Sequence, residues 1–196
     1  MKKMKHLDLF SGIGGFSLAA DWTWENVEHI FVEIDPFCQQ VLKKHWPHSI
    51  IYGDIKTLKT DDIGRVDLLS GGFPCQPFSV AGKRRAQEDN RFLWPAMFRV
   101  IKETKPTWIV GENVAGIIEL ALEQVCADLE SEGYEVWPIV IPACAVNAPH
   151  RRDRVWIVAH TKSTGARSEG RTVADEGGRA GEDRREGIRQ AYGAFS

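Results

Sequence analysis

Cysteine is scarce in the 196-residue sequence, and no two cysteines form a C-x-x-C pair. The four cysteines stand far apart, at Cys38, Cys75, Cys126 and Cys144. Structural zinc sites and disulfide frameworks use grouped cysteines, so we expect free thiols and no metal site.

Long hydrophobic runs are also missing. No stretch approaches the roughly 20 apolar residues that cross a bilayer, and Asp8 interrupts the apolar stretch after the basic start. We therefore expect a cytoplasmic protein without a membrane partner. The formal net charge of −2 gives no overall sign of a nucleic-acid partner, so any DNA contact has to use local basic groups.

Short apolar segments alternate with segments of helical periodicity over most of the chain. The expected strands are residues 5–10, 27–34, 49–52, 65–70 and 107–111, and the expected helices are residues 16–24, 36–46, a segment between 90 and 105, and 116–132. This alternation predicts an α/β fold with a doubly wound, mostly parallel sheet. Gly133 is placed to cap the last helix.

The alternation of strand-like and helical segments ends after residue 133. Residues 134–141 and 154–160 are both strand-like without a good helix between them, which predicts an antiparallel pair at the edge of the sheet. We expect residues 1–160 to form one catalytic and cofactor-binding domain. Residues 161–196 are rich in glycine and charge and poor in large apolar side chains, which predicts a disordered tail, a linker or the start of a truncated recognition region.

A glycine-rich turn, Ser11-Gly12-Ile13-Gly14-Gly15, follows the first expected strand. Backbone at such a turn can approach a ligand closely at the carboxyl edge of a parallel sheet. Glu33 and Asp54 follow the next two strands, and an acid there can accept hydrogen bonds from a ribose diol. The turn has no Lys or Arg, which favours a nucleoside without phosphates, or a sulfonium beside the acids. The alternative is an ordinary turn with solvated acids.

A second polar turn, residues 71–79, follows the fourth expected strand and contains Cys75 between Pro74 and Gln76. Cysteine is a good nucleophile when positive groups or amide dipoles favour its thiolate. Alternatively, Cys75 is a small buried hydrophobic residue, although a turn rich in Gly and Pro is an odd place for one. The basic run at 83–85 could hold phosphate, or it is simply solvated.

Two further segments carry polar groups. Glu112 follows the fifth expected strand, where a carboxyl group with apolar neighbours can donate a proton to a ring nitrogen; alternatively, it caps the next helix. Arg152 and Arg154 alternate along an extended segment and would share one face. They could hold a carboxylate or a phosphate, or discourage aggregation at a sheet edge.

Together these segments resemble the cytosine-C5 DNA methyltransferase family, which carries ordered motifs along one chain. The matching segments are residues 8–16, 33–35, 53–55, 72–79, 112–114 and 150–154. The family's eighth motif usually opens with Gln, where this chain has His150. Residues 161–196 resemble neither the family's recognition domain nor its ninth and tenth motifs.

The resemblance implies a Rossmann-like fold that uses S-adenosylmethionine, yields S-adenosylhomocysteine and needs no metal. Glu33 would hold the ribose. The implied cofactor-binding residues are Asp8, Phe10, Ser11, Gly12, Ile13, Gly14, Gly15, Glu33, Ile34, Asp54, Ile55 and Pro74. The implied catalytic residues are Cys75 as the nucleophile at cytosine C6, Glu112 at N3 and the exocyclic amine, and Arg154 with Arg152 at the base oxygen or at Glu112. The implied DNA contacts are Gln76, Ser79, Lys83 and Arg84.

The expected reaction is methyl transfer to C5 of cytosine in double-stranded DNA through a Cys75 adduct, by a cytoplasmic bacterial or phage-encoded enzyme acting at the nucleoid. Three alternatives stay open: the catalytic subunit of a split enzyme whose second chain carries the recognition domain, an inactive truncated fragment that binds only the cofactor, and an RNA cytosine methyltransferase. Ser17 breaks the dinucleotide fingerprint, which disfavours an oxidoreductase. The sequence indicates neither the target site nor a restriction-modification, phage-protection or orphan role.

Overall fold

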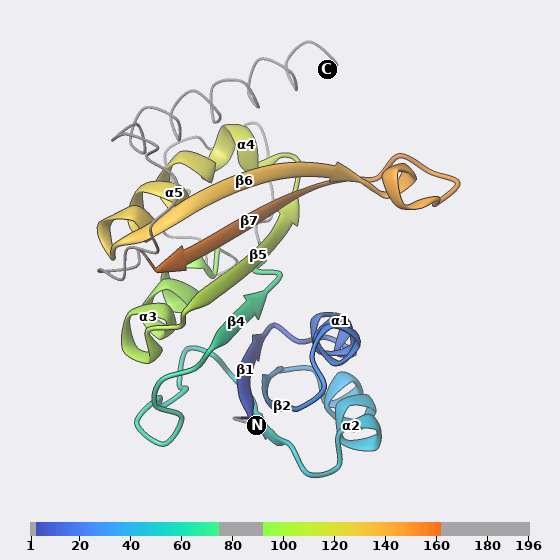
Figure 1. The fold of residues 1–196 in the computed structure, drawn as a ribbon, viewed down its shortest axis with the longest axis vertical. Coiled ribbons are helices and arrows are strands. Elements are labelled where there is room, and N and C mark those ends of the chain that lie inside the picture. Colours follow the sequence, from blue (N-terminus) through green and yellow to red (C-terminus); the bar gives the residue numbers. More distant parts are fainter. Residues whose placement is uncertain (1–2, 75–91, 162–196) are drawn as a thin grey trace, which may run out of the picture. The chain divides into compact units, whose positions relative to one another are not determined.

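The computed structural model describes residues 3–74 and 92–161, which fall into two compact units that divide between Asn113 and Val114. The first unit contains a parallel sheet in the order β3-β2-β1-β4-β5 (Figure 1). Its strands are β1 Met4–Leu9, β2 Val27–Val32, β3 Ile50–Tyr52, β4 Leu68–Gly71 and β5 Trp108–Val114. The chain builds outward from β1 through β2 to β3 and then restarts on the other side of β1 with β4. The carboxyl ends of β1 and β4 therefore meet at a switch in strand order, where ligands bind in open α/β sheets.

Three helices accompany the parallel strands: α1 Gly15–Thr23, α2 Pro36–His45 and α3 Trp94–Thr104. Helix α1 and helix α2 lie on one side of the strands and α3 on the other (Figure 1). The start of α2 is set locally, because the Asp35 side chain accepts hydrogen bonds from the amides of Phe37 and Cys38 and Pro36 suits the first turn. Helix α3 buries one face at helical spacing, formed by Trp94, Met97, Val100, Ile101 and Thr104.

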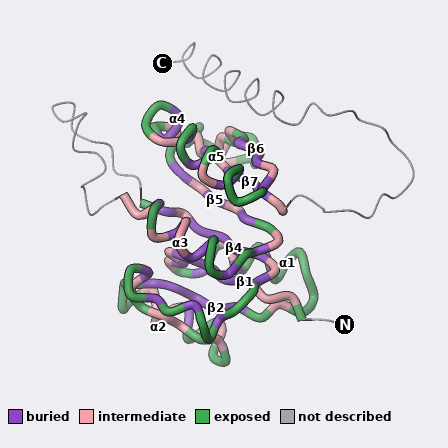
Figure 2. The backbone as a smooth tube through the Cα atoms, turned by 90° about the vertical axis from the view of Figure 1, so that its left-hand side faces the viewer, coloured by how far each residue is buried: buried purple, intermediate pink, exposed green. Residues whose placement is uncertain are grey.

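The core of the first unit follows its central strands, which are the most continuously buried part of the tube in Figure 2. Leu7, Leu9, Phe31 and Leu69 are completely shielded from solvent. Strands buried on both faces read as nearly continuous apolar runs, which is why the sequence pattern located them. The exceptions are four buried polar side chains on β1, β2 and β4: His6, Asp8, His29 and Ser70.

The second unit contains the antiparallel pair β6 Tyr134–Pro142 and β7 Asp153–Thr161, which stay in register from Tyr134–Thr161 to Pro142–Asp153. Its helices are α4 Ile117–Leu120 and α5 Leu122–Ser131, and a short 3-10 helix at Ala143–Val146 follows β6. The prediction of one helix over 116–132 is wrong, because Ala121 has an extended φ of −151° and separates α4 from α5. Gly133 follows α5 with a φ of +83°, in keeping with the expected glycine cap.

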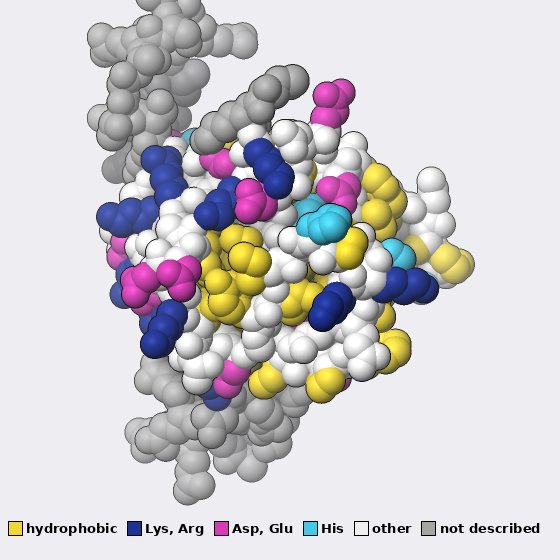
Figure 3. Space-filling view, turned by 90° about the horizontal axis from the view of Figure 1, so that it is seen from below, with side chains coloured by type: hydrophobic (Ala, Val, Ile, Leu, Met, Phe, Trp, Pro, Cys, Tyr) yellow, Lys and Arg dark blue, Asp and Glu magenta, His cyan; other side chains and the backbone are white. Residues whose placement is uncertain are grey.

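The predicted α/β class, with a mostly parallel sheet and an antiparallel strand pair, is confirmed. Over residues 3–74 and 92–161, no helix is long and apolar enough to cross a membrane. On the face seen in Figure 3, Lys and Arg side chains lie close to Asp and Glu side chains with hydrophobic groups between them, as the small net charge suggests.

Candidate cofactor and catalytic site

The glycine-rich turn leaves the carboxyl end of β1 with an unusual backbone. Phe10, Gly12 and Gly14 have φ angles of +53°, +53° and +90°. A Cβ at Gly14 would lie 2.5 Å from Cζ3 of Trp46, so the turn needs glycine there both for its dihedral angle and for space. At Gly12 the space is open and only the dihedral angle favours glycine.

Glu33 lies directly against this turn. Its Oε2 accepts a hydrogen bond from the Gly12 amide at 2.7 Å, and its Oε1 accepts one from the Asp35 amide at 2.8 Å. Gln39 fixes the backbone of the same residue by donating to the Glu33 carbonyl at 2.6 Å. The carboxylate is only 9% exposed, but each oxygen has a second lone pair. Glu33 is thus held in place by main-chain donors and can still accept from a ligand hydroxyl.

Asp8 and Ser11 support the turn from inside. The Ser11 hydroxyl donates to the Asp8 carbonyl at 2.6 Å, and the Ser11 amide donates to the Val32 carbonyl at 3.2 Å. The Asp8 carboxyl group is fully buried; its Oδ2 lies 2.9 Å from the Ser17 hydroxyl and its Oδ1 lies 2.6 Å from the Ser70 hydroxyl. Burial raises its pKa to about 7, against the lowering effect of these two hydroxyls. The Asp8 side chain therefore contacts other parts of the fold, and a direct cofactor contact for it stays a prediction.

Apolar side chains close to these acids in the sequence form the second part of the candidate site. Ile34 and Ile13 are 68% and 63% exposed, which is unusual for isoleucine and leaves both able to contact a ligand ring. Ile55 is buried, with 4% exposure. Asp54 is half-buried, and its Oδ1 accepts from the Lys56 amide at 2.9 Å.

Arg99 was missed by sequence reasoning. Its guanidinium group donates to the carbonyls of Ile55 and Leu58 at 2.8 Å and 3.2 Å and pairs with Glu103 at 2.8 Å. It thereby joins helix α3 to the segment that follows Asp54. Its position on the polar face of α3 could have suggested a surface ion pair, but nothing in the sequence indicates the two carbonyls.

The segment leading to Cys75 is held by β5. The Asn113 side-chain amide is buried and donates to the Phe73 carbonyl at 2.8 Å. A Cβ at Gly72 would lie 3.3 Å from Oε2 of Glu112, so the Glu112 carboxylate lies against the backbone three residues before Cys75. Phe73 packs on Trp94 with ring centroids 5.2 Å apart. Sequence reasoning placed Glu112 after its strand, but β5 continues to Val114 and contains it.

Several sequence predictions fall outside the described residues. These are Cys75, Gln76, Ser79, Lys83, Arg84 and the tail beyond residue 161. Pro74 is described and exposed, and its carbonyl accepts a long 3.4 Å hydrogen bond from the Leu93 amide. Among the residues that are described, no three His, Cys, Asp or Glu side chains are grouped to hold a metal ion.

The two predicted arginines lie in the second unit. Arg154 is in β7, half-buried, and donates to the Asp153 carbonyl at 2.8 Å. Arg152 precedes the strand and has a φ of +40°, so the alternation expected for an extended segment does not reach it. The extended segment on which the sequence argument for a shared face depends therefore does not include Arg152.

Comparison with known proteins assigns the family. The model of the family "C-5 cytosine-specific DNA methylase" matches residues 4–180. The chain belongs to this family. It is 36% identical over 178 residues to the type II methyltransferase M.HgiCII of Herpetosiphon aurantiacus, covering 84% of this chain and 39% of that protein. It is also 36% identical over 180 residues to the type II methyltransferase M.NgoBV of Neisseria gonorrhoeae, covering 83% and 43%.

Solved structures agree on the fold. The S. pombe Dnmt2 methyltransferase superposes with a TM-score of 0.70 at 23% sequence identity, covering 85% of this chain and 52% of that one. The chain spans about 40% of the length of the two curated relatives. The matched residues 4–180 include the glycine-rich turn, Glu33 and Glu112.

Proposed function

We propose that the chain carries the catalytic part of an enzyme that transfers a methyl group from S-adenosylmethionine to C5 of cytosine in double-stranded DNA. The observation that carries the proposal is the position of Glu112, whose carboxylate lies against Gly72 at the start of the turn that contains Cys75. A buried hydrogen bond from the neighbouring Asn113 to Phe73 fixes the same turn. The acid therefore lies against the short segment that leads, in the sequence, to the Cys75 thiol.

The residues around the glycine-rich turn fit this cofactor. Glu33 keeps lone pairs for the two ribose hydroxyls, and Ile34 has exposed apolar surface for an adenine ring. The turn, residues 10–15, has no Lys or Arg to bind phosphate. We assign the other predicted cofactor residues, Asp54, Ile55 and Pro74 included, to the walls of this site. When bound, S-adenosylmethionine supplies an electrophilic methyl group.

The chemistry is assigned to the side chains of the chain. The Cys75 thiolate adds to cytosine C6, and the ring electrons move toward C5 and N3. Glu112 contacts N3 and the exocyclic amine, where a proton from its carboxyl group stabilises the enamine. C5 would then take the methyl group as the bond between that group and sulfur breaks and S-adenosylhomocysteine is released. A base removes the C5 proton, Cys75 leaves as C5=C6 is restored, and the N3 proton returns to Glu112.

The reaction requires the target cytosine to leave the base stack, because its C5 and C6 cannot be reached inside a duplex. We assign Gln76, Ser79, Lys83 and Arg84 to DNA contacts around the extruded base. Arg154, with Arg152, is assigned to the base oxygen or to orienting Glu112. These assignments rest on the family motifs.

The test is covalent trapping on mixed-sequence duplex DNA in which 5-fluorocytosine replaces cytosine, with S-adenosylmethionine present. A base cannot remove fluorine from C5 as it removes a proton, so Cys75 cannot be eliminated. The Cys75–C6 bond therefore persists, and a denaturing gel shows the adduct. The expected result is an adduct with the natural chain and none with Cys75→Ser. Cys144→Ser is the matched control, because Cys144 is an exposed thiol in the second unit and the adduct should remain.

A second candidate is suggested by coverage, since the chain spans 39% and 43% of the length of the curated relatives. It is a catalytic subunit that needs another chain to present DNA, or a fragment that binds only the cofactor. An adduct that forms only after a recognition domain is added supports the subunit. Failure to form an adduct under both conditions, with S-adenosylhomocysteine still bound, contradicts the catalytic proposal. An adduct on 5-fluorocytosine RNA but not on DNA would reassign the substrate.

A further inference from the structure

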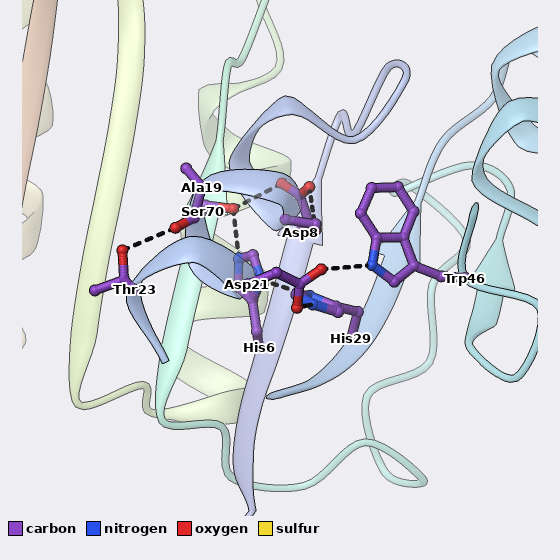
Figure 4. A network of polar contacts seen from close by, with 9 residues as sticks. His6, Asp8, Ala19, Asp21, Thr23, His29, Trp46 and Ser70 are labelled. Carbon is purple, nitrogen blue, oxygen red and sulfur yellow. Dashed lines mark hydrogen bonds and ion pairs between the residues drawn. The ribbon is translucent and has the colours of Figure 1, made fainter. Parts of the chain in front are cut away.

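A chain of polar side chains, buried except for Asp21 at its outer end, runs through the first unit (Figure 4). From the inside outward, Asp8 Oδ1 contacts Ser70 Oγ at 2.6 Å, and Ser70 Oγ contacts His6 Nε2 at 2.7 Å. His6 Nδ1 contacts His29 Nδ1 at 3.0 Å, and His29 Nε2 contacts Asp21 Oδ1 at 2.9 Å. Five groups are thus linked by four short contacts, each of which needs one hydrogen atom.

Counting these hydrogen atoms shows that the chain holds an extra proton. Ser70 supplies one, and the neutral imidazoles of His6 and His29 supply one each. With Asp8 and Asp21 both ionised, three hydrogen atoms would serve four contacts, and two acceptors would face each other within 3.0 Å. A fourth proton resolves this conflict, and it can reside on Asp8, on an imidazole or on Asp21.

These arrangements differ in how much charge they bury. If His29 or Asp21 takes the proton, Asp8 stays ionised at 0% exposure, and a charged His29 is paired only with Asp21, at 2.9 Å. If Asp8 takes it, the only charge left in the chain is on Asp21, whose side chain is 40% exposed. Burying an unpaired charge is far more costly than burying a neutral hydrogen-bonded acid, which favours the arrangement with the proton on Asp8.

The surroundings of Asp8 agree with a neutral acid. Its Oδ2 accepts from the Ser17 hydroxyl at 2.9 Å, so Oδ1 is the oxygen free to carry the proton toward Ser70. The other charged group that acts on it is Glu33 of the turn, which disfavours a second negative charge. Burial and the neighbouring His29 lower the pKa of His6 to about 3, which keeps this link in the chain neutral. Hydrogen bonds from His29 and Trp46 outweigh burial at Asp21 and lower its pKa, so its charge is stable.

We propose that Asp8 acts as a neutral acid that donates from Oδ1 to Ser70 while Oδ2 accepts from Ser17, and that it is a positioning residue for the glycine-rich turn. The carboxyl group joins helix α1, which begins after the turn, to strand β4, which leads into Gly72. Its own carbonyl accepts from Ser11 within the turn. This role concerns the fold beneath the site and can be tested without the reaction.

The conservative variant Asp8→Asn distinguishes whether Asp8 is a neutral hydrogen-bond donor or an ionised acceptor. The asparagine amide nitrogen can donate to Ser70 and its oxygen can accept from Ser17, so the variant copies the protonated acid and cannot titrate. The pKa of Asp8 is raised from 3.8 to about 7. Protonation of Asp8 therefore stabilises the fold fully below pH 3.8, and this stabilisation is lost as the pH rises to about 7. The folding constant of Asp8→Asn divided by that of the wild type should therefore rise about a hundredfold between pH 5 and pH 8.

The experiment measures urea unfolding of the full chain at both pH values for the wild type, Asp8→Asn and Asp62→Asn. Asp62 is exposed, and the ratio for this control should stay within about threefold. A ratio for Asp8→Asn that stays constant or falls overturns the proposal, because an Asp8 ionised at both pH values gives that result.

Two further measurements complete the test. The wild type should show the infrared carbonyl stretch of a buried protonated carboxylic acid at pH 5 and lose it near pH 7; its absence overturns the proposal even if Asp8→Asn does not fold. For the positioning role, hydrogen exchange at the Gly14 and Leu18 amides should be as slow in Asp8→Asn as in the wild type, and faster in Asp8→Ala. Equal exchange in all three would refute that role.

Discussion

Replacing Gly14 by alanine tests how tightly the glycine-rich turn is packed. The backbone at Gly14 has a φ of +90°, where a side chain costs about 1–2 kcal/mol. The added methyl carbon would also lie 2.5 Å and 2.7 Å from two ring atoms of Trp46 and 3.0 Å from Leu42. Overpacking of this kind adds about 1–3 kcal/mol. We therefore expect Gly14→Ala to lower the free energy of unfolding by about 2–5 kcal/mol.

Gly12→Ala is the matched control, because Gly12 also has a positive φ, of +53°, but has no atom within 4 Å of the added carbon. It should cost only about 1–2 kcal/mol. Urea unfolding of both variants gives the comparison. In a Trp46→Phe background the smaller ring should relieve Gly14→Ala by about 1–3 kcal/mol and leave Gly12→Ala unchanged. Equal costs for the two alanine variants, or no coupling to Trp46, would refute the packing argument.

Two other changes test the cofactor site through calorimetric binding of S-adenosylhomocysteine, with unfolding in urea as the check that the variants fold. Glu33→Ala removes the acceptor of the Gly12 and Asp35 amides and the proposed ribose partner, so affinity should fall about 10- to 100-fold, and unchanged affinity would contradict the assignment. Arg99→Met keeps the aliphatic stem of Arg99 but loses the hydrogen bonds to Ile55 and Leu58; affinity should fall about tenfold, whereas the control Arg65→Met, at an exposed side chain, should bind normally.

Much of the fold could be predicted because its strands are buried on both faces and read as short apolar runs. The limits of the elements depend on tertiary contacts. Residues 65–67 precede β4 although they were predicted within it; the Asp67 amide bonds to the Lys5 carbonyl outside the paired register. The break at Ala121 has no sequence signal, since alanine is a strong helix former and neither glycine nor proline stands there.

Glu33 and Asp54 could be predicted because they follow the ends of β2 and β3, which parallel pairing brings to one edge, whereas Glu112 lies within β5. The buried polar chain could not. His6 and His29 are directly opposite each other in the β1–β2 register, and register between parallel strands is not written in either strand alone. Arg99 escaped prediction for a related reason: its partners are main-chain carbonyls of a loop, which have no residue signature.

The way in which Glu33 is held has a consequence for engineering. Both carboxylate oxygens accept hydrogen bonds from main-chain amides, so the carboxylate is held by backbone, while Gln39 holds the Glu33 carbonyl. The exposed side chains of Ile13 and Ile34 can therefore be trimmed or enlarged while the acid stays where it is. Under the proposed cofactor assignment, these two positions are the places to change for a cofactor analogue with a bulkier base or transferable group.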